Sequence, residues 1–248
     1  MTQPIYAIGD IHGHDDKLQL ALERIARDGG PEAEVVFLGD LVDRGPDSRG
    51  VIERLKQGVA DGRPWHVLLG NHDRMFARFL RGGVVHDARI LSGLPWTDVR
   101  LGGLATLASY GIAATAETPL SDLFAAAQAA VPADHLAFIE SRPLTLERDG
   151  RLFVHAGIRP GVALADQDPD DLVWIRDPFL SCPDPFPWLV IHGHTALEFP
   201  QHFGNRIDLD GGAGYGRPVH PAVIEGRDAW VLTEDGRQPL PPTPDFSR

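Results

Sequence analysis

The sequence predicts an α/β fold in which strands and helices first alternate and hairpin-type strands then follow. Three early apolar runs each end in a Gly-Asp or Gly-Asn pair, and each is followed by apolar residues at helical spacing. From about residue 144 the pattern changes to short strands separated by turn residues. A chain of 248 residues fits one large core, so we expect a single domain over residues 1–235.

The early part of the chain is predicted to contain three strand–loop–helix units. A strand over residues 5–8 precedes a helix marked by the apolar positions of residues 18–25. A second strand over residues 35–38 precedes a helix that begins at about Ser48, which is a plausible N-cap. The third strand, over residues 67–69, precedes apolar positions within residues 75–80.

The later part of the chain reads as strands and loops. Asp149-Gly150 is a hairpin signal between strands over residues 144–146 and 152–154. Further strands are predicted over residues 189–191, 206–209, 222–224 and 229–232. Residues 82–143 lack this regular alternation of strand and helix and are predicted to form a cap. Within it, residues 101–111 would either face the substrate or serve only for packing. Residues 236–248 contain four prolines and are predicted to be a flexible tail.

Charge and composition exclude several classes of function. Lys and Arg total 23 against 35 Asp and Glu, a formal net charge of −12 that disfavours a nucleic-acid-binding surface or adhesion to an anionic membrane. The chain has no apolar run near the roughly 20 residues that span a bilayer. Cys182 is the single cysteine and the N-terminus lacks a signal-peptide pattern, so we expect a cytoplasmic protein. The oligomeric state is not predicted.

Asp, Asn and His side chains gather directly after the predicted strands, where ligand sites of open α/β sheets lie. These residues are Asp10, His12, Asp40, Asp43, Asn71, His72, His155, His192 and His194. Carboxylate, amide and imidazole groups together suit divalent first-row metals. Asp10 and His12 are two positions apart and face the same side of an extended backbone. Asp40 has two carboxylate oxygens and could bridge two ions, as two-metal hydrolases require.

Five short motifs occur in order along the chain: GDIHG at 9–13, GDLVDRG at 39–45, GNHD at 70–73, HAG at 155–157 and GHT at 193–195. This series resembles the calcineurin-like metallophosphoesterases, and within them the bacterial phosphoprotein phosphatase branch. The resemblance implies a four-layer sandwich in which two mixed β-sheets are flanked by helices. The metals would lie at the strand ends.

The resemblance also implies a ligand set for two divalent metal ions, which we expect to be Mn²⁺, with iron or zinc compatible with the same groups. The first ion would be held by Asp10, His12 and Asp40. The second would be held by Asp40, Asn71, His155 and His194. Ala196 stands where the broader superfamily often has another histidine, so the first ion would keep more water ligands.

The reaction implied by the resemblance is in-line attack on phosphorus by a hydroxide that bridges the two ions. His72 matches the general acid toward the leaving oxygen, and Asp43 matches the carboxylate that orients it. Arg44 in GDLVDRG is expected to grip the phosphoryl oxygens. Arg176 is assigned the same role from its order and neighbourhood in the sequence LVWIRD.

Single residues also have structural interpretations. Asp10 or Asp40 alone would more often cap a turn or a helix, and Arg44 alone could form a weak surface pair with Asp47. His192 lies two residues before His194 and is expected to support the ligands rather than bind metal. The presence of all five motifs in order favours the site interpretation.

The substrate is less determined by the sequence than the reaction. We expect a serine/threonine protein phosphatase acting on a phosphorylated protein. The alternative is a hydrolase of small phosphorylated substrates, either dinucleoside polyphosphates or other nucleotides. At Asp73 the chain resembles the diadenosine tetraphosphate hydrolases, since protein phosphatases usually have glutamate there. Those hydrolases, however, tend to lack the acid that corresponds to Asp43. We give more weight to Asp43 because it has a role in the mechanism. A catalytically dead, phosphate-binding scaffold is a third hypothesis, against which the intact ligand set argues.

Overall fold

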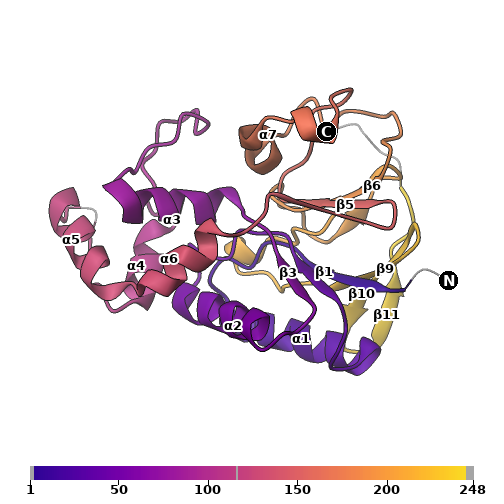
Figure 1. The fold of residues 1–248 in the computed structure, drawn as a ribbon, viewed down its shortest axis with the longest axis horizontal. Helices are drawn as coiled ribbons and strands as arrows, with labels where there is room; N and C mark the ends of the chain where they lie inside the picture. Colours follow the sequence, from indigo (N-terminus) through magenta and orange to yellow (C-terminus); the bar gives the residue numbers. More distant parts are fainter. Residues whose placement is uncertain (1–2, 116, 244–248) are drawn as a thin grey trace.

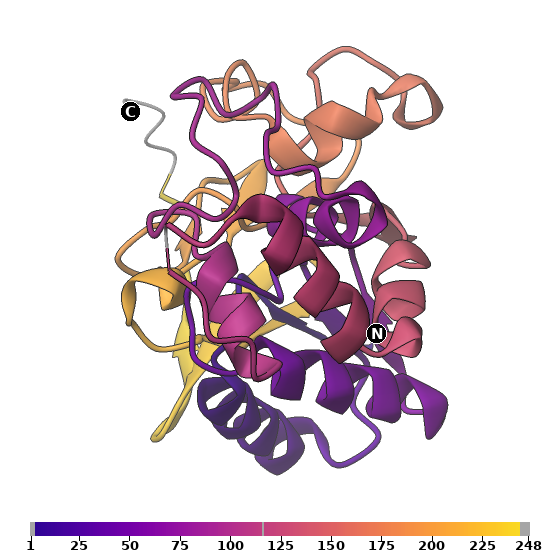
Figure 2. The same cartoon turned by 90° about the vertical axis from the view of Figure 1, so that its left-hand side faces the viewer.

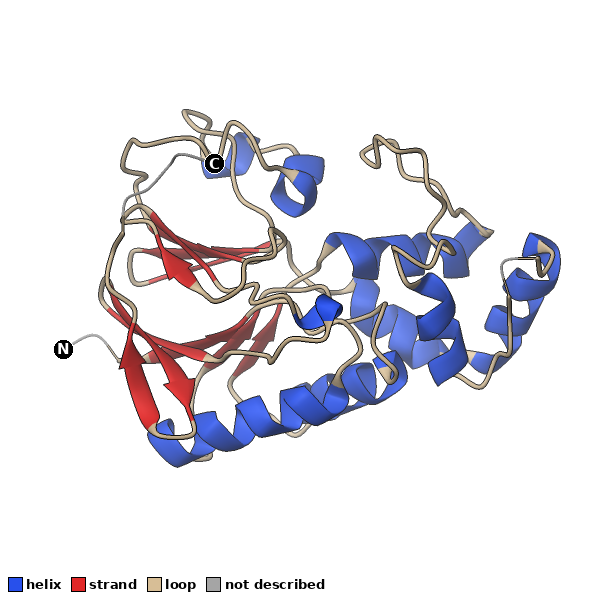
Figure 3. Cartoon of the chain, turned by 180° about the vertical axis from the view of Figure 1, so that it is seen from behind, coloured by secondary structure: helices blue, strands red, loops and turns tan. Residues whose placement is uncertain are grey.

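The computed structural model describes residues 3–115 and 117–243 of the chain. Two mixed β-sheets lie face to face, and helices cover the outer side of each sheet (Figures 1 and 3). The layers therefore run helix, sheet, sheet, helix. This arrangement confirms the α/β sandwich that the sequence predicts.

The first sheet has six strands in the order β11-β10-β9-β1-β2-β3. Its parallel part consists of β1 (Ile5–Ile8), β2 (Val35–Phe37) and β3 (Trp65–Val67). Its antiparallel part consists of β9 (Ala222–Glu225), β10 (Asp228–Thr233) and β11 (Gly236–Pro239). The strand predicted over residues 67–69 thus lies two residues earlier, and residues 68–70 form the loop that leads to the site.

The second sheet has five strands in the order β4-β5-β6-β8-β7. Its parallel centre consists of β5 (Arg151–Val154), β6 (Leu189–His192) and β8 (Arg206–Asp208). The antiparallel edges are β4 (Thr145–Arg148) and β7 (Gln201–His202). Arg148 pairs with Arg151 across the predicted Asp149-Gly150 turn, which confirms that hairpin.

Helices α1 (Asp15–Gly29) and α2 (Ser48–Ala60) cover the first sheet. A second helical group lies beyond the ends of the parallel strands, and Figure 2 looks onto it; its members are α3 (Asn71–Gly82), α4 (Gly103–Ser109), α5 (Leu120–Ala130) and α6 (Ala133–Glu140). The short α7 (Pro169–Trp174) lies over the second sheet. Among the described residues, none of the helices has the length and apolar character needed to cross a membrane.

The N-terminus of α2 differs in detail from the prediction. Asp47, rather than Ser48, is the N-cap, and its carboxylate accepts a hydrogen bond from the Gly50 N–H. The Ser48 hydroxyl instead accepts a hydrogen bond from the backbone N–H of Asp43. The side chain of Ser48 therefore supports the loop that carries a predicted site residue.

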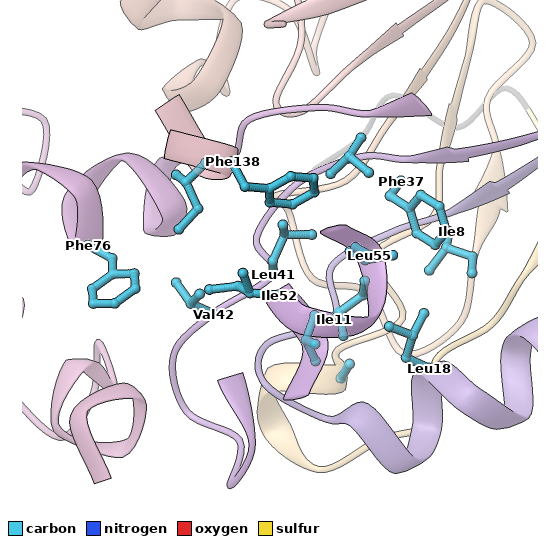
Figure 4. Packing of buried hydrophobic residues seen from close by; sticks show 14 of the residues in the cluster. Ile8, Ile11, Leu18, Phe37, Leu41, Val42, Ile52, Leu55, Phe76 and Phe138 are labelled. Carbon is cyan, nitrogen blue, oxygen red and sulfur yellow. The ribbon is translucent and has the colours of Figure 1, made fainter. Parts of the chain in front are cut away.

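Strand β1 is buried on both faces. Its successive side chains point to opposite sides of the sheet, and they pack alternately into two apolar clusters. Tyr6 and Ile8 pack toward the helices with Leu18 and Phe37, and Figure 4 shows this cluster. Ile5 and Ala7 pack into the cluster between the two sheets. The loop that follows β1 is thus anchored to a strand that is packed from both sides.

The region after residue 235 differs from the flexible tail that the sequence predicts. Residues 236–239 form the edge strand β11, and the N–H of Leu240 donates to Ala229 at 2.8 Å while its side chain is buried. β11 pairs with β10 alone, and an edge strand tolerates Pro239, which has no N–H to donate. Residues 244–248 of the predicted tail lie outside the described residues.

Candidate metal centre and active site

The strand-end loops of both sheets meet at a cavity of about 710 Å³. Eight of the ten predicted site residues line this cavity: Asp10, His12, Asp40, Arg44, Asn71, His72, Arg176 and His194. The other two, Asp43 and His155, are fully buried and contact residues that line it. Residues that are far apart in the sequence are thus brought to one place by the ends of the strands.

The first group of candidate ligands surrounds His12. Its Nε2 atom lies 3.8 Å from Asp10 Oδ2 and 3.7 Å from Asp40 Oδ2. The other ring nitrogen, Nδ1, lies 2.9 Å from the carbonyl oxygen of Val42, so Nδ1 carries the proton and Nε2 carries the lone pair that a metal would bind, which here accepts from Arg44. Burial, followed by the charge of Arg44, holds the pKa of His12 well below its usual value. The neutral imidazole that a metal requires is therefore favoured.

The second group is built around Asn71, whose Oδ1 atom lies 2.9 Å from both His155 Nε2 and His194 Nδ1. His155 Nδ1 lies 2.9 Å from the carbonyl oxygen of Leu38, which fixes the ring. Asp40 belongs to this group as well, since its Oδ1 atom is 3.4 Å from His155 Nε2. The two oxygens of Asp40 therefore face two different groups of ligands, as expected for a carboxylate that two ions share.

The chemistry of these donors fits divalent cations. Burial, followed by the charges of Asp210 and Asp40, raises the pKa of Asp10 well above its usual value. A bound cation would relieve the repulsion between these carboxylates. The Nε2 atom of His194 is buried and has no hydrogen-bond partner within the described part of the chain. Burial also lowers the pKa values of His155 and His194, so both rings are neutral. Neutral imidazoles with carboxylate and amide oxygens are ligands that Mn, Fe and Zn accept.

The backbone around these ligands is unusual. Five of the site residues have positive φ angles: His12 (49°), Asp40 (49°), Asp43 (75°), Arg44 (70°) and His194 (67°). Such angles are uncommon outside glycine, and strained backbone of this kind gathers at functional sites. A Cβ atom at Gly70 would collide with Asp40, and one at Gly193 with the Asp10 carboxylate. The glycines of the motifs are needed so that backbone and ligands approach closely.

His72 and Asp43 form a buried pair beside the two groups of ligands. His72 lies in the first turn of α3, where its N–H donates to Asp40 Oδ1 at 2.9 Å. Its ring atom Nδ1 is 2.7 Å from Asp43 Oδ2, and its Nε2 atom lies 3.3 Å from Arg44 Nη2 at the cavity. Asp43 thus fixes the orientation of His72, with Nε2 directed toward the cavity.

Two further residues hold Asp43, and the sequence interpretation did not identify either. Trp96 donates from Nε1 to Asp43 Oδ2 at 2.8 Å, and Thr106 donates from its hydroxyl to Asp43 Oδ1 at 2.6 Å. Thr106 belongs to residues 101–111, for which the sequence leaves a substrate-side role and a packing role open. Thr106 is fully buried behind Asp43, whereas Leu101 of the same segment lines the cavity.

Asp73 is buried and does not line the cavity. Its carboxylate accepts hydrogen bonds from the N–H groups of Leu41 at 2.8 Å and Gly70 at 2.9 Å. Burial, followed by the charge of Asp40, raises the pKa of Asp73 to about 7. Asp73 therefore ties together the loops that follow β2 and β3.

The predicted arginines lie at the cavity in different settings. Arg44 is 2.9 Å from His12 Nε2 through its Nη1 atom, and its guanidinium lies 5.2 Å from the ring centroid of Tyr215. Arg176 is exposed, and its Nη2 atom donates to the carbonyl oxygen of His194 at 3.4 Å. Asp210, which we did not predict, is buried beside Asp10 and lines the same cavity. Its position after a predicted strand, before a glycine, is the signal that could have identified it.

Known proteins share this sequence pattern and fold. The family model for calcineurin-like phosphoesterases matches residues 3–216. A symmetrical bis(5'-nucleosyl)-tetraphosphatase of Janthinobacterium sp. (strain Marseille) is 32% identical over 62% of this chain, and that match spans 44% of the relative's length. The asymmetrical bis(5'-nucleosyl)-tetraphosphatase PrpE of Bacillus velezensis is 27% identical, with 93% of this chain and 98% of the relative covered.

Two solved structures share the fold at low sequence identity. One is described as a putative diadenosine tetraphosphatase; its TM-score is 0.66 at 22% identity, with 97% of this chain and 95% of that chain covered. The other is a cold-active protein tyrosine phosphatase with a TM-score of 0.66 at 18% identity, with 98% and 80% covered. The same architecture thus occurs in proteins named for different substrates.

Proposed function

The chain belongs to the calcineurin-like phosphoesterases, and from this premise we propose that it hydrolyses dinucleoside polyphosphates. It is a metal-dependent phosphoric ester hydrolase, as the sequence predicts. The names of the two relatives support the alternative that the sequence left open better than the preferred protein phosphatase. Asp73, rather than Asp43, is then the residue that agrees with the proposed substrate.

The observation that carries the proposal is the shape and charge of the cavity. From the candidate metal ligands it extends to four arginines, Arg44, Arg89, Arg176 and Arg217, in a chain whose net charge is −12. Its volume of about 710 Å³ lies within the range of pockets that enclose small-molecule ligands. A single phosphoester group would occupy little of this space, whereas a nucleotide with several phosphates would use both the volume and the positive charge.

Two divalent ions would be held by the two groups of ligands, with Asp40 shared between them. Asp10 and His12 complete the first group, and Asn71, His155 and His194 complete the second. When bound, such ions activate a water molecule as nucleophile and neutralise charge on the phosphoryl oxygens. Mn²⁺ remains our prediction for the metal.

The protein's own side chains would orient the substrate and supply a proton. Arg44 lies between His12 and His72 and would bind the phosphoryl oxygens through its Nη atoms. His72 would donate the proton on Nε2 to the leaving oxygen, because Nδ1 is engaged by Asp43. Residues 82–143 would act as a cap, since Arg89, Leu91 and Leu101 line the cavity.

Protein phosphatase activity is a second candidate, and the hydrogen bond between His72 and Asp43 favours it. The leaving group of phosphoserine or phosphothreonine is a strongly basic alkoxide that needs a proton. The leaving group of a phosphoanhydride is a phosphate, which leaves more readily without one. An acid held by a buried carboxylate therefore has greater value toward a phosphoester.

Turnover of the Mn²⁺-reconstituted protein on two substrates tests the proposal. Diadenosine tetraphosphate and a phosphothreonine peptide are compared at matched concentrations, and we expect the larger kcat/KM for the dinucleotide. Chromatography of the products distinguishes symmetrical cleavage into two ADP molecules from asymmetrical cleavage into AMP and ATP. Preference for the peptide would select the second candidate, and no turnover with any divalent metal would select the scaffold hypothesis.

A further inference from the structure

Two hydrogen-bond donors beside the candidate metal centre have no partner among the described residues. These are the Nε1 atom of Trp174 and the hydroxyl of Thr195, and both atoms are buried. Both residues line the cavity that contains the metal ligands. The indole ring of Trp174 meets the ring of His194 edge-on, with centroids 5.9 Å apart, and Thr195 directly follows His194. The donors thus adjoin a candidate metal ligand but bind neither of the two ligand groups.

Positive charge flanks these donors. Arg176 lies two residues after Trp174, and its hydrogen bond to the His194 carbonyl holds it against the segment that carries Thr195. Arg89 reaches the same cavity from the loop after α3, where its guanidinium donates to Asp171 of α7 at 2.9 Å. Among the described residues, the carboxylates that line the cavity are Asp10, Asp40 and Asp210, all on the metal side. The wall formed by residues 174–176 and 195 therefore presents donors and cations.

We propose that Trp174 Nε1, the Thr195 hydroxyl and Arg176 bind the phosphoryl group next to the one that is hydrolysed, so that the site recognises a diphosphate unit. This replaces the role that the sequence predicts for Arg176, which is to bind the hydrolysed group together with Arg44. This inference rests on the proposed function and names its recognition element. Buried donors in proteins are nearly always paired, and an anionic oxygen is the acceptor that pairs with them most strongly.

A phosphopeptide would use this wall less well. Beyond its ester oxygen, phosphoserine continues into carbon and then into neutral peptide groups. A phosphoanhydride chain continues into a second phosphoryl group whose oxygens carry charge. Neutral carbonyl groups could accept from Trp174, but they would leave the charge of Arg176 without a counterpart.

Calorimetric titration of the Mn²⁺-reconstituted protein tests the subsite. The probes are methylenediphosphonate, which is a non-hydrolysable diphosphate, and orthophosphate, both at fixed excess Mn²⁺ with their chelation measured separately. We expect tighter binding of the diphosphonate by the wild type. Trp174→Phe and Thr195→Val should each weaken it by about tenfold, the loss expected for one hydrogen bond to a charged group, and leave orthophosphate within about twofold.

Trp188→Phe is the matched control, because Trp188 is partly buried against a different apolar cluster and does not line the cavity. It should leave both affinities unchanged. If Trp174→Phe fails to fold, Thr195→Val carries the test, since it changes the hydroxyl and keeps the shape. Unchanged selectivity in these variants would overturn the subsite, as would weakened binding of a phosphothreonine peptide in place of the diphosphonate. Retained selectivity without turnover of diadenosine tetraphosphate would instead overturn the proposed function alone.

Discussion

The two sides of the cavity differ in burial and in what holds them. On the metal side, Asp10, Asp40 and Asn71 are at most 4% exposed and follow the three parallel strands of the first sheet. On the substrate side, Leu91 is 98% exposed and Tyr215 is 67% exposed, and both lie in segments outside the sheets. We therefore expect the packed scaffold to determine the chemistry of the site and the exposed loops to determine the choice of substrate.

The bonding on the two sides differs in the same way. The metal side is fixed by buried hydrogen bonds to backbone groups, such as those of Asp73 to Leu41 and Gly70. The substrate side is held by ion pairs between α7 and neighbouring segments, among them Arg74 with Asp170 at 2.7 Å and Arg159 with Asp171 at 2.6 Å. Partly exposed pairs of this kind are weakened by salt. Substitutions on the two sides should therefore affect different measurements.

The largest expected effect is that of Asp40→Asn. Because the Asp40 oxygens face both groups of ligands, the change should impair both ions at once. We expect turnover to fall by more than the about 10² to 10⁴-fold that loss of a general acid alone costs. Steady-state kinetics with added Mn²⁺ measure this, with Asp16→Asn on the exposed start of α1 as a control. Near wild-type turnover in Asp40→Asn would contradict the assignment of Asp40 as a ligand shared by two ions.

His72→Asn should have the next largest effect. We expect kcat to fall by about 10² to 10⁴-fold while the bound metal, measured by mass spectrometry, stays the same, because the proposed mechanism gives His72 the role of a proton donor and not of a ligand. The loss should be greater with a phosphothreonine peptide than with a dinucleotide, since an alkoxide needs the proton more. His86→Asn on the exposed loop after α3 is the control. Unchanged kcat would remove His72 from the mechanism, and lost metal would make it a ligand.

The metal side could be predicted from the sequence because its signals are local. Each ligand comes shortly after an apolar run and lies within two residues of a glycine, as Asp40 and Asn71 do, so order and spacing suffice. The supports of Asp43 could not be found in this way. Trp96 and Thr106 lie 53 and 63 residues further along the chain, and their contacts depend on the course of an irregular loop. Edge strand β11 was missed because its pairing with β10 outweighs the local preference of a proline-rich sequence.

On the substrate side, Leu91→Ser should change the choice of substrate and leave the chemistry intact. Leu91 is exposed and lines the cavity, so its loss should leave the free energy of unfolding within about 0.5 kcal/mol. We expect kcat/KM for diadenosine tetraphosphate to fall by about three- to tenfold, which corresponds to the free energy of burying part of a leucine side chain against the substrate. The kcat/KM for p-nitrophenyl phosphate should not change. Val99→Ser is the matched control, because Val99 is 85% exposed in the same loop but does not line the cavity. Equal losses on both substrates would contradict a role in selectivity.

The smallest effect is expected far from the cavity, at Asp28. Hydrogen bonds from Arg237 of β11, and then from Tyr6, lower the pKa of Asp28 in the folded chain. Its stabilising contribution is therefore complete above its unfolded pKa of about 3.9 and is lost as the pH falls through the lower folded value. Asp28→Asn should lower the free energy of unfolding by at most about 1 kcal/mol at pH 7. The free energy of unfolding should also fall less steeply below about pH 4 in this variant than in the wild type.

Urea unfolding at pH 7 and at pH 3 measures this contribution, with the exposed Asp235→Asn as control. Turnover at pH 7 should not change, because Asp28 lies outside the cavity. An unaltered pH dependence of unfolding would mean that the contact between α1 and β11 adds nothing to stability.

The number of divalent ions bound per chain shows whether the two groups of ligands hold two metal ions. The wild-type protein is reconstituted with Mn²⁺, freed of excess metal by gel filtration, and assayed for metal and protein in the same fractions. Two groups of ligands that share Asp40 predict two ions per chain. One ion per chain, or none, would contradict the account of the metal side on which the proposed function depends.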